Sequence, residues 1–200
     1  MSSFGEDAGF KPSIFVWKAG ASGNAQPIRT IVGPATGLRT TAGSAFDSGS
    51  KLFVSTGYHD SIEVFTPTSD GNVAPLRKIA GANTGLSYPA NIAIDPTTNN
   101  VWAANVSNDS LTEYGHTDQG NVAPLVTIKG AKTKLDYPYG IAVDAAGYIY
   151  AGNCQQSVTK PPAVGSILVF APGASGNVAP VQVITGSRAD LTCVGGLAVR

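Results

Sequence analysis

Two histidines, His59 and His116, are the first candidates for chemistry, because an imidazole can bind zinc or transfer a proton near neutral pH. His59 lies between the second and third predicted strands of its repeat unit, and His116 lies between the third and fourth strands of the next unit. Antiparallel strands place these two kinds of loop at opposite ends of a sheet, so the pair cannot share a metal ion. The placement argues against a zinc enzyme and leaves no Ser–His–acid triad for the chain to assemble.

Three aspartates recur just after the first predicted strand of each unit, at Asp47, Asp95 and Asp144, and Arg200 takes the fourth place. Carboxylates in register around an axis could bind calcium. The residues that follow favour tight turns instead, since Asp95 precedes a proline and Asp144 precedes Ala-Ala-Gly. We predict turn residues and no cofactor, with calcium as the alternative.

Cys154 and Cys193 could form a disulfide. Cys154 ends a second strand and Cys193 precedes the first strand of the next unit, so both lie on the same face of neighbouring units. A disulfide would attach the segment 155–165 to the following unit and would indicate an oxidising compartment. Two free thiols are the alternative.

The same face gathers uncharged side chains that can form hydrogen bonds. The candidate binding residues are Tyr58, His59, Asn91, Asn105, Tyr139, Asn153, Gln155 and Gln156. Tyr and Asn recognise peptides or sugars at modest entropic cost. Tyr88 and Tyr137, each followed by a proline, are predicted to pack between units. The segment 154–165 departs from the repeat by about eight extra residues, and irregular loops on regular scaffolds often carry function.

These candidates are positioned by a unit that occurs about four times. Its most regular feature is a Gly-Asn pair followed at fixed offsets by Pro, Ile and Gly. The pairs are Gly23-Asn24, Gly71-Asn72, Gly120-Asn121 and Gly176-Asn177, at spacings of 48, 49 and 56 residues. Self-similarity at this period indicates a repeat architecture. We interpret the pairs as turn residues that tolerate a positive φ.

Each unit contains four short runs with the pattern of strands. In the third unit these are Gly140–Asp144, Tyr148–Gly152, Ser166–Phe170 and Val181–Thr185. They are rich in β-branched and aromatic residues and are bounded by Gly, Asp or Asn. Helical periodicity free of Gly and Pro is absent, so we expect no sizeable helix. The pattern predicts an all-β chain, a β-propeller of four-stranded antiparallel blades, with a long β-sandwich as the alternative.

The third unit resembles a known family. The runs Pro-x-Gly-Ile-Ala-Val-Asp, Gly-Tyr-Ile-Tyr-Ala-Gly-Asn and Ser-Ile-Leu-Val-Phe, within residues 138–170, are similar to the NHL-repeat type of β-propeller. The resemblance extends over residues 13–200 and implies the fold. It implies no particular chemistry, because that family mixes scaffolds, ligand binders and a few enzymes.

The repeat also predicts the domain organisation. Residues 1–12 match no unit and form a lead-in, and blade units fall at about 13–33 (partial), 41–81, 89–130, 138–186 and 194–200 (partial). The two ends supply third and fourth strands and one first strand, Gly196–Val199, so a complete ring would lack one strand. We therefore expect about four blades or a partial ring of a larger propeller. A compact four-bladed ring completed by residues 1–12 is the alternative.

Composition narrows the partners. The net charge is zero and 13% of residues are charged, so no basic stripe exists for nucleic acid. No apolar run approaches the roughly 20 residues that a membrane span requires. Low charge with abundant Ser, Thr and Asn is typical of exported proteins, which predicts an extracellular or periplasmic location, although residues 1–12 do not read as a signal peptide.

These observations predict a non-enzymatic NHL-like module that binds a protein, peptide or glycan through the face carrying the segment 154–165. One alternative is a calcium-dependent propeller hydrolase or lyase of gluconolactonase-like type. Another is a structural or truncated repeat segment without activity. Self-association through an open blade edge is a further expected interaction.

Overall fold

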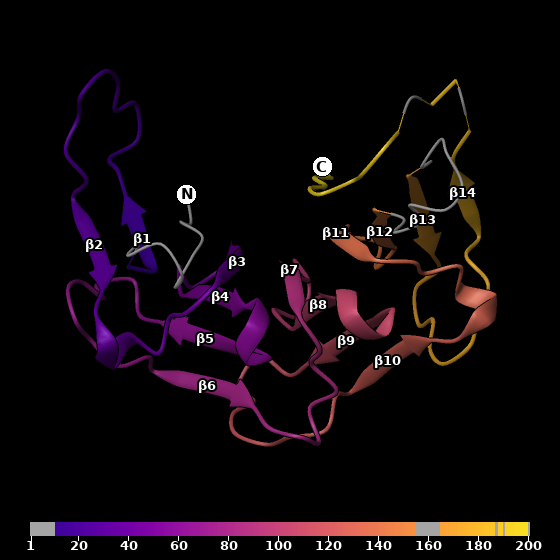
Figure 1. The fold of residues 1–200 in the computed structure, drawn as a ribbon, viewed down its shortest axis with the longest axis horizontal. Helices are drawn as coiled ribbons and strands as arrows, with labels where there is room; N and C mark the ends of the chain where they lie inside the picture. Colours follow the sequence, from indigo (N-terminus) through magenta and orange to yellow (C-terminus); the bar gives the residue numbers. More distant parts are fainter. Residues whose placement is uncertain (1–10, 155–164, 187, 190, 200) are drawn as a thin grey trace.

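The computed structural model describes residues 11–154, 165–186, 188–189 and 191–199, and its strands are labelled in Figure 1. The strands form three four-stranded antiparallel sheets and one two-stranded sheet in this part of the chain. The first full sheet contains β3 (Thr41–Phe46), β4 (Leu52–Thr56), β5 (Ser61–Phe65) and β6 (Arg77–Ala80). The second contains β7 (Pro89–Ile94), β8 (Val101–Asn105), β9 (Ser110–Tyr114) and β10 (Val126–Lys129). The third contains β11 (Pro138–Val143), β12 (Ile149–Asn153), β13 (Ser166–Phe170) and β14 (Gln182–Ile184), and the short sheet pairs β1 (Ser13–Val16) with β2 (Arg29–Val32).

The prediction of an all-β chain of four-stranded blades is confirmed. In the third unit β11 begins at Pro138, two residues before the predicted start, and β12 and β14 each begin one residue after it. The described residues contain four single-turn 3₁₀ helices, η1 (Pro34–Thr36), η2 (Gly57–His59), η3 (Val106–Asn108) and η4 (Ala131–Thr133). Within the same residues, no helix has the length and apolar character that a membrane crossing needs.

The predicted strand Gly196–Val199 is the exception, because residues 191–199 join no ladder. The segment nevertheless runs beside β11: a Cβ built on Gly140 would lie 2.8 Å from the Val194 carbonyl oxygen. It therefore takes the innermost position of a further unit without becoming a strand. A strand needs a hydrogen-bonded neighbour in a ladder, and this segment has no ladder partner among the described residues.

The blades form an open arc (Figure 1). Strands β3, β7 and β11 lie towards the centre and β6, β10 and β14 lie at the perimeter, while the β1–β2 end and the β14 end stand apart. The described residues thus form an open arc, as the predicted partial ring requires, and residues 1–10, on which the alternative closed ring depends, lie outside the described residues.

The hydrophobic core lies between consecutive sheets. Each of three clusters combines side chains of one sheet with those of the sheet before it. The aromatic residue that ends each third strand of a full sheet, Phe65, Tyr114 or Phe170, is 0% exposed and packs against the preceding sheet. A single sheet cannot bury both of its faces, so the blades stabilise one another.

The Gly-Asn pairs form hydrogen bonds between neighbouring blades. Asn121 of the second sheet accepts a hydrogen bond from Asn83 N–H in the connection that leaves the first sheet, at 2.8 Å. Asn72 and Asn177 make the same 2.8 Å contact with Ala35 N–H and Lys132 N–H. The turn interpretation was right for the glycines, since Gly71, Gly120 and Gly176 have φ of 69°, 74° and 69°. It was incomplete for the asparagines, whose hydrogen-bond donors lie across the blade boundary.

The glycine at the end of each unit leaves space for the asparagine side chain of the next blade. Gly81 has φ 129°, and a Cβ there would collide with the Asn121 side chain. At Gly130, with φ 123°, a Cβ would lie 2.6 Å from Asn177. Backbone hydrogen bonds complete the junction at Gly81. Gly120 N–H donates to Lys78 O at 2.7 Å, and Ala80 N–H donates to Gly120 O at 3.0 Å. Each junction therefore combines a buried aromatic ring, an isolated parallel β-bridge and a hydrogen bond to the asparagine side chain.

One carboxyl group is buried at the first junction. Glu63 on β5 is 0% exposed, and its Oε1 accepts from Ser61 Oγ at 2.8 Å and lies 3.2 Å from Lys78 Nζ. Its Oε2 has no partner in the structure. Loss of hydration raises the pKa of Glu63 above its ordinary 4.5, against the opposing effects of Ser61 and Lys78.

Replacing Asn121 with Ala should lower the free energy of unfolding by about 1 kcal/mol, because Asn83 N–H loses its acceptor. The matched control is Asn24→Ala, at the same position of the repeat in the β1–β2 connection, where no such contact exists among the described residues. This variant should stay within about 0.5 kcal/mol of the parent. Urea unfolding at low protein concentration, followed by circular dichroism, measures both. Equal losses of unfolding free energy in the two variants would contradict a stabilising role for the hydrogen bond between Asn83 N–H and Asn121.

Glu63→Gln tests the buried carboxyl group. A folded-state pKa above 4.5 means that the folded protein holds the proton more tightly than the unfolded chain. Stability from this group is complete below pH 4.5 and is lost as the pH rises through the folded-state pKa. The free energy of unfolding of the parent minus that of the variant should therefore fall across this range. A difference that stays constant or rises with pH would show that burial does not dominate.

Candidate functional site

Three tyrosines from two blade boundaries come together on one face of the arc. Tyr58 lies in η2, and its ring meets that of Tyr88 edge-on, with centroids 5.0 Å apart and an interplanar angle of 79°. Tyr88 lies just before β7, at the start of the next blade, and it neighbours Tyr139 on β11 of the blade after that. Tyr58 is 73% exposed and Tyr88 and Tyr139 are half-buried, so the cluster has one projecting ring on a packed base.

The backbone beneath the cluster is held in an unusual conformation. Tyr88 has φ 50°, which a residue with a large side chain rarely adopts. Asp60, which ends η2, accepts a hydrogen bond from Tyr88 N–H at 2.6 Å and fixes that conformation. Asp109 and Tyr137 repeat the arrangement at the next boundary, at 2.8 Å and with a φ of 52° at Tyr137. The Tyr58–Tyr88 pair is therefore preorganised by a hydrogen bond between blades, from Tyr88 N–H to Asp60.

The hydroxyl group of Tyr88, at the centre of the cluster, stays protonated. Burial, together with the neighbouring Tyr139 and Tyr58, raises the pKa of Tyr88 to about 12. At physiological pH the Tyr88 hydroxyl can still donate a hydrogen bond. The cluster can therefore offer a ligand an aromatic edge and neutral hydrogen-bonding groups.

Of the other predicted binding residues, His59 and Asn91 lie close in sequence to Tyr58 and Tyr88. His59 is exposed and follows Tyr58 in η2. Asn91 lies on β7 towards the centre, where its Nδ2 donates to Gly195 O at 3.4 Å and links β7 to the C-terminal segment. Gln155 and Gln156 lie outside the described residues.

Asn105 and Asn153 instead use their side chains inside the blades. Asn105 is 0% exposed, donates to Thr112 Oγ1 at 2.9 Å and accepts from Ser87 N–H at 3.2 Å. Asn153 is 3% exposed and donates to Lys134 O at 2.8 Å. Both tie a strand end to the connection beside it, so the candidate binding face is built from the tyrosines rather than from these amides.

Tyr88 was predicted to pack between units and does so, but it is also the centre of the cluster. The Tyr-Pro pair could not reveal this, because the contact with Tyr58 depends on how two blades meet. The alternation of loops was a usable signal, since it placed Tyr58 and Tyr88 on the same face.

A disulfide joins Cys154 and Cys193, whose Cα atoms are 4.0 Å apart. Cys154 N–H donates to Tyr137 O at 2.9 Å, as Gly57 N–H donates to Thr40 O at 2.9 Å in the first full blade. The pair therefore holds the two repeat positions that Gly57 and Tyr88 hold at an earlier boundary, where a Cβ on Gly57 would lie 2.9 Å from the Tyr88 ring. A noncovalent contact between blades is here replaced by a covalent bond.

The recurring aspartates close turns, as predicted. Asp47 Oδ1 accepts from Lys51 N–H at 2.7 Å, and Asp95 Oδ1 accepts from Thr97 N–H at 2.7 Å. Asp144 accepts from Tyr148 N–H at 2.9 Å and from the Tyr150 hydroxyl at 3.0 Å. In the described part of the chain, no three His, Cys, Asp or Glu side chains lie close enough together to hold a metal ion. The two histidines lie in a β4–β5 and a β9–β10 connection, at opposite strand ends.

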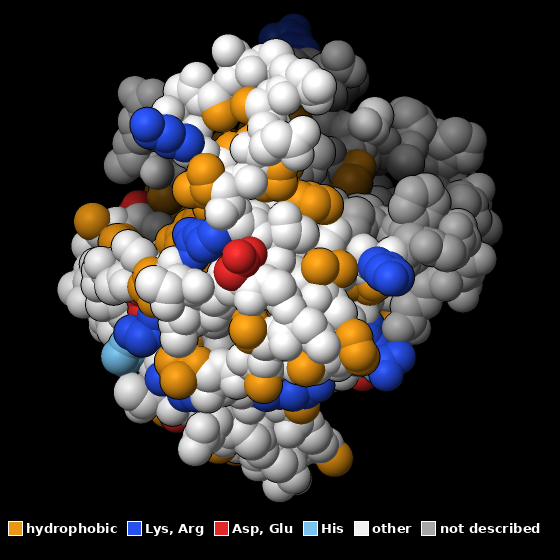
Figure 2. Space-filling view, turned by 90° about the vertical axis from the view of Figure 1, so that its left-hand side faces the viewer, with side chains coloured by type: hydrophobic (Ala, Val, Ile, Leu, Met, Phe, Trp, Pro, Cys, Tyr) orange, Lys and Arg blue, Asp and Glu red, His pale blue; other side chains and the backbone are white. Residues whose placement is uncertain are grey.

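The surface at the β1–β2 end is mostly uncharged. Figure 2 shows hydrophobic side chains scattered over it, with Lys and Arg side chains set apart from one another. Contacts with a ligand on such a surface depend on shape, apolar area and neutral hydrogen bonds.

No protein-family model and no curated protein matches the chain. Solved structures do match it. Hydrazine synthase from Kuenenia stuttgartiensis is 13% identical with a TM-score of 0.58, over 80% of this chain and 40% of that one. A candidate 6-phosphogluconolactonase from Bacteroides uniformis is 20% identical with a TM-score of 0.58, over 86% of this chain and 51% of that one. This chain therefore spans about half of such a structure or less. Identities this low show the fold alone, a propeller-like all-β fold, and the NHL-type assignment stays a prediction.

Proposed function

We propose that the protein is a non-enzymatic, NHL-like propeller module that binds a protein, peptide or glycan on the face that carries Tyr58, Tyr88 and Tyr139. The observation that carries this proposal is Tyr58. Its ring is 73% exposed, yet it is held edge-on against Tyr88 instead of extending freely into solvent.

Preorganisation is what makes this surface suitable for binding. A rigid tyrosine contributes contact area at low entropic cost, because only two side-chain torsions need to be fixed. The base of the cluster is already fixed by the hydrogen bond from Tyr88 N–H to Asp60. The neutral Tyr88 hydroxyl suits a polar ligand without strong charge, and the exposed His59 follows Tyr58 in η2.

The disulfide supports an extracellular or periplasmic location as part of this proposal, because disulfides persist in oxidising compartments. It also lies on the proposed binding face, since Cys154 holds the repeat position of Gly57, next to Tyr58. The segment 155–164, predicted to take part in binding, lies outside the described residues and carries none of the present argument.

The second candidate function is a calcium-dependent hydrolase or lyase of gluconolactonase-like type. The fold similarity to a candidate 6-phosphogluconolactonase favours it. The aspartates predicted as calcium ligands weigh against it, because their oxygens accept hydrogen bonds within their own turns. A structural segment without activity of its own is the third candidate, and it accords with the partial coverage of the matched structures.

Replacing Tyr58 with Ala should weaken binding about tenfold or more, as for an aromatic anchor at an interface. The matched control is Tyr148→Ala, a 38% exposed tyrosine on the β11–β12 turn, at the opposite strand end. Immobilised glycan and peptide libraries supply the ligand, and surface plasmon resonance measures the variants against each hit. Ligands that bind both variants as tightly as the parent would place the binding site elsewhere.

Calcium calorimetry separates the two leading candidates. The binding-module proposal expects no saturable heat when calcium is added to millimolar concentration. A saturable signal that is lost in Asp95→Asn or Asp144→Asn would favour the calcium-dependent enzyme and would contradict the assignment of these aspartates to turns.

A further inference from the structure

Three blade boundaries within the chain are built from the same parts. The following blade contributes an aromatic ring at the end of its third strand and the Gly-Asn turn beyond it. The preceding blade contributes a buried isoleucine on its outer strand and the glycine that closes its unit. Ile31, Ile79 and Ile128 are 1%, 1% and 0% exposed at these boundaries. The two ends of the arc carry the same parts without partners among the described residues.

The β1–β2 end carries the contribution of a following blade. Trp17 holds the position of Phe65 but is 41% exposed, whereas Phe65 is 0% exposed. The turn beyond it is already formed: Ala21 N–H donates to Lys18 O at 3.0 Å, as Ser69 N–H donates to Thr66 O at 3.1 Å. Gly23 has φ 59°, close to the 69° of Gly71.

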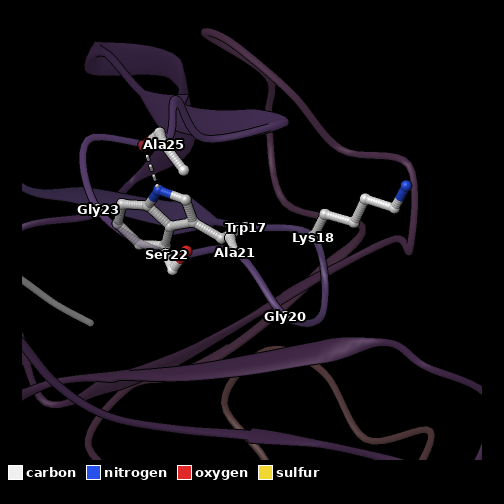
Figure 3. A pocket seen from close by; sticks show the side chains of 7 residues that line it. All are labelled: Trp17, Lys18, Gly20, Ala21, Ser22, Gly23 and Ala25. Atoms are coloured by element: carbon white, nitrogen blue, oxygen red, sulfur yellow. Dashed lines mark hydrogen bonds between the residues drawn. The ribbon is translucent and has the colours of Figure 1, made fainter.

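Figure 3 shows how this turn is supported. The Trp17 indole lies over the loop that contains Gly23, and its Nε1 donates to Ala25 O at 3.1 Å. Lys18 extends away from the loop. The Gly23-Asn24 pair is thus held in the conformation that its counterparts use between blades.

The other end carries the contribution of a preceding blade. Ile184 on β14 holds the position of Ile128 but is 48% exposed. Gly186 has φ 107°, like the other closing glycines, yet no atom lies within 4 Å of a Cβ built on it. At Gly81 and Gly130 the corresponding space holds an asparagine side chain. We name the surface of Ile184 and Gly186 the socket, and Trp17 with Gly23-Asn24 the plug.

We propose that the plug of one molecule packs into the socket of a second copy of this chain, forming a fourth blade junction between molecules. The two ends stand apart in the arc, so one molecule cannot join them itself (Figure 1). The partner is inferred from the sequence of the chain, because the plug has the same sequence pattern as the residues that fill the corresponding surface at the three internal blade boundaries. Length also agrees, since the match covers 51% of the candidate lactonase, and two copies approach one such structure.

The C-terminal segment limits how much of the junction can form. Val194 is 7% exposed and covers Gly152, where a Cβ would meet the Val194 carbonyl oxygen. The disulfide at Cys193 holds this segment in place, so the inner half of the last blade is already covered. The incoming copy therefore contacts the outer half, around β13 and β14. The interface is head-to-tail, with different surfaces on the two partners.

Association of the 200-residue protein is measured by sedimentation velocity over a range of concentrations, with the disulfide intact. The parent should associate reversibly as the concentration rises. Asn24→Ala removes the plug's acceptor and should raise the dissociation constant about fivefold to tenfold. Gly186→Val fills the socket and should prevent association. Asn177→Ala, at an internal junction, should lower stability and leave association unchanged.

Mixing the two variants makes the test specific. The Asn24→Ala copy keeps an intact socket, and the Gly186→Val copy keeps an intact plug. An equimolar mixture should therefore form a one-to-one dimer through one parental junction, although neither variant associates well alone. A parent that stays monomeric at millimolar concentration would overturn the proposal and leave the socket to a different occupant. Association that neither variant changes, or a mixture without recovery, would overturn it as well, with circular dichroism confirming that both variants are folded.

Discussion

Packing between neighbouring blades is the interaction on which the rest of the structure depends. Among the described residues, the first and second full sheets each contribute side chains to one cluster with the sheet before and to another with the sheet after. Phe65, Tyr114 and Phe170 are fully buried because a preceding blade covers them. In repeat architectures of this kind, stability is approximately a sum over units and their interfaces, so the junction is the unit of stability.

The candidate binding face is a consequence of that packing. Tyr58 and Tyr88 come from different blades, and they meet because the boundary sets the distance between η2 and the start of β7. The hydrogen bond to Asp60 holds Tyr88 in a left-handed conformation that it would not adopt unaided. At the last boundary the same two repeat positions carry Cys154 and Cys193, and the contact becomes covalent. The same positions of the repeat thus serve the proposed ligand binding at one boundary and a covalent link between blades at another.

The ends of the arc follow the same logic. A repeat unit carries complementary surfaces on its two sides, so any array that does not close leaves one surface of each kind without a partner. Trp17 is more exposed than the buried Phe65, and Ile184 is more exposed than the buried Ile128, although each belongs to the same repeat position as its counterpart. The difference arises from what lies beside each residue and not from the residue type.

The spacing of Gly-Asn, Pro, Ile and Gly was sufficient to predict the all-β fold and its four-stranded sheets, because strand period and turn residues are local properties of the chain. The turn role of Asp47, Asp95 and Asp144 followed from sequence for the same reason. Other features needed the tertiary structure. Asn105 and Tyr58 look equally polar in the sequence, yet one is buried in a hydrogen-bond network and the other projects from the surface. The hydrogen bond to Asn121, the tyrosine cluster, the orphaned oxygen of Glu63 and the irregular segment 191–199 all depend on contacts between units far apart in the chain, which no local pattern records.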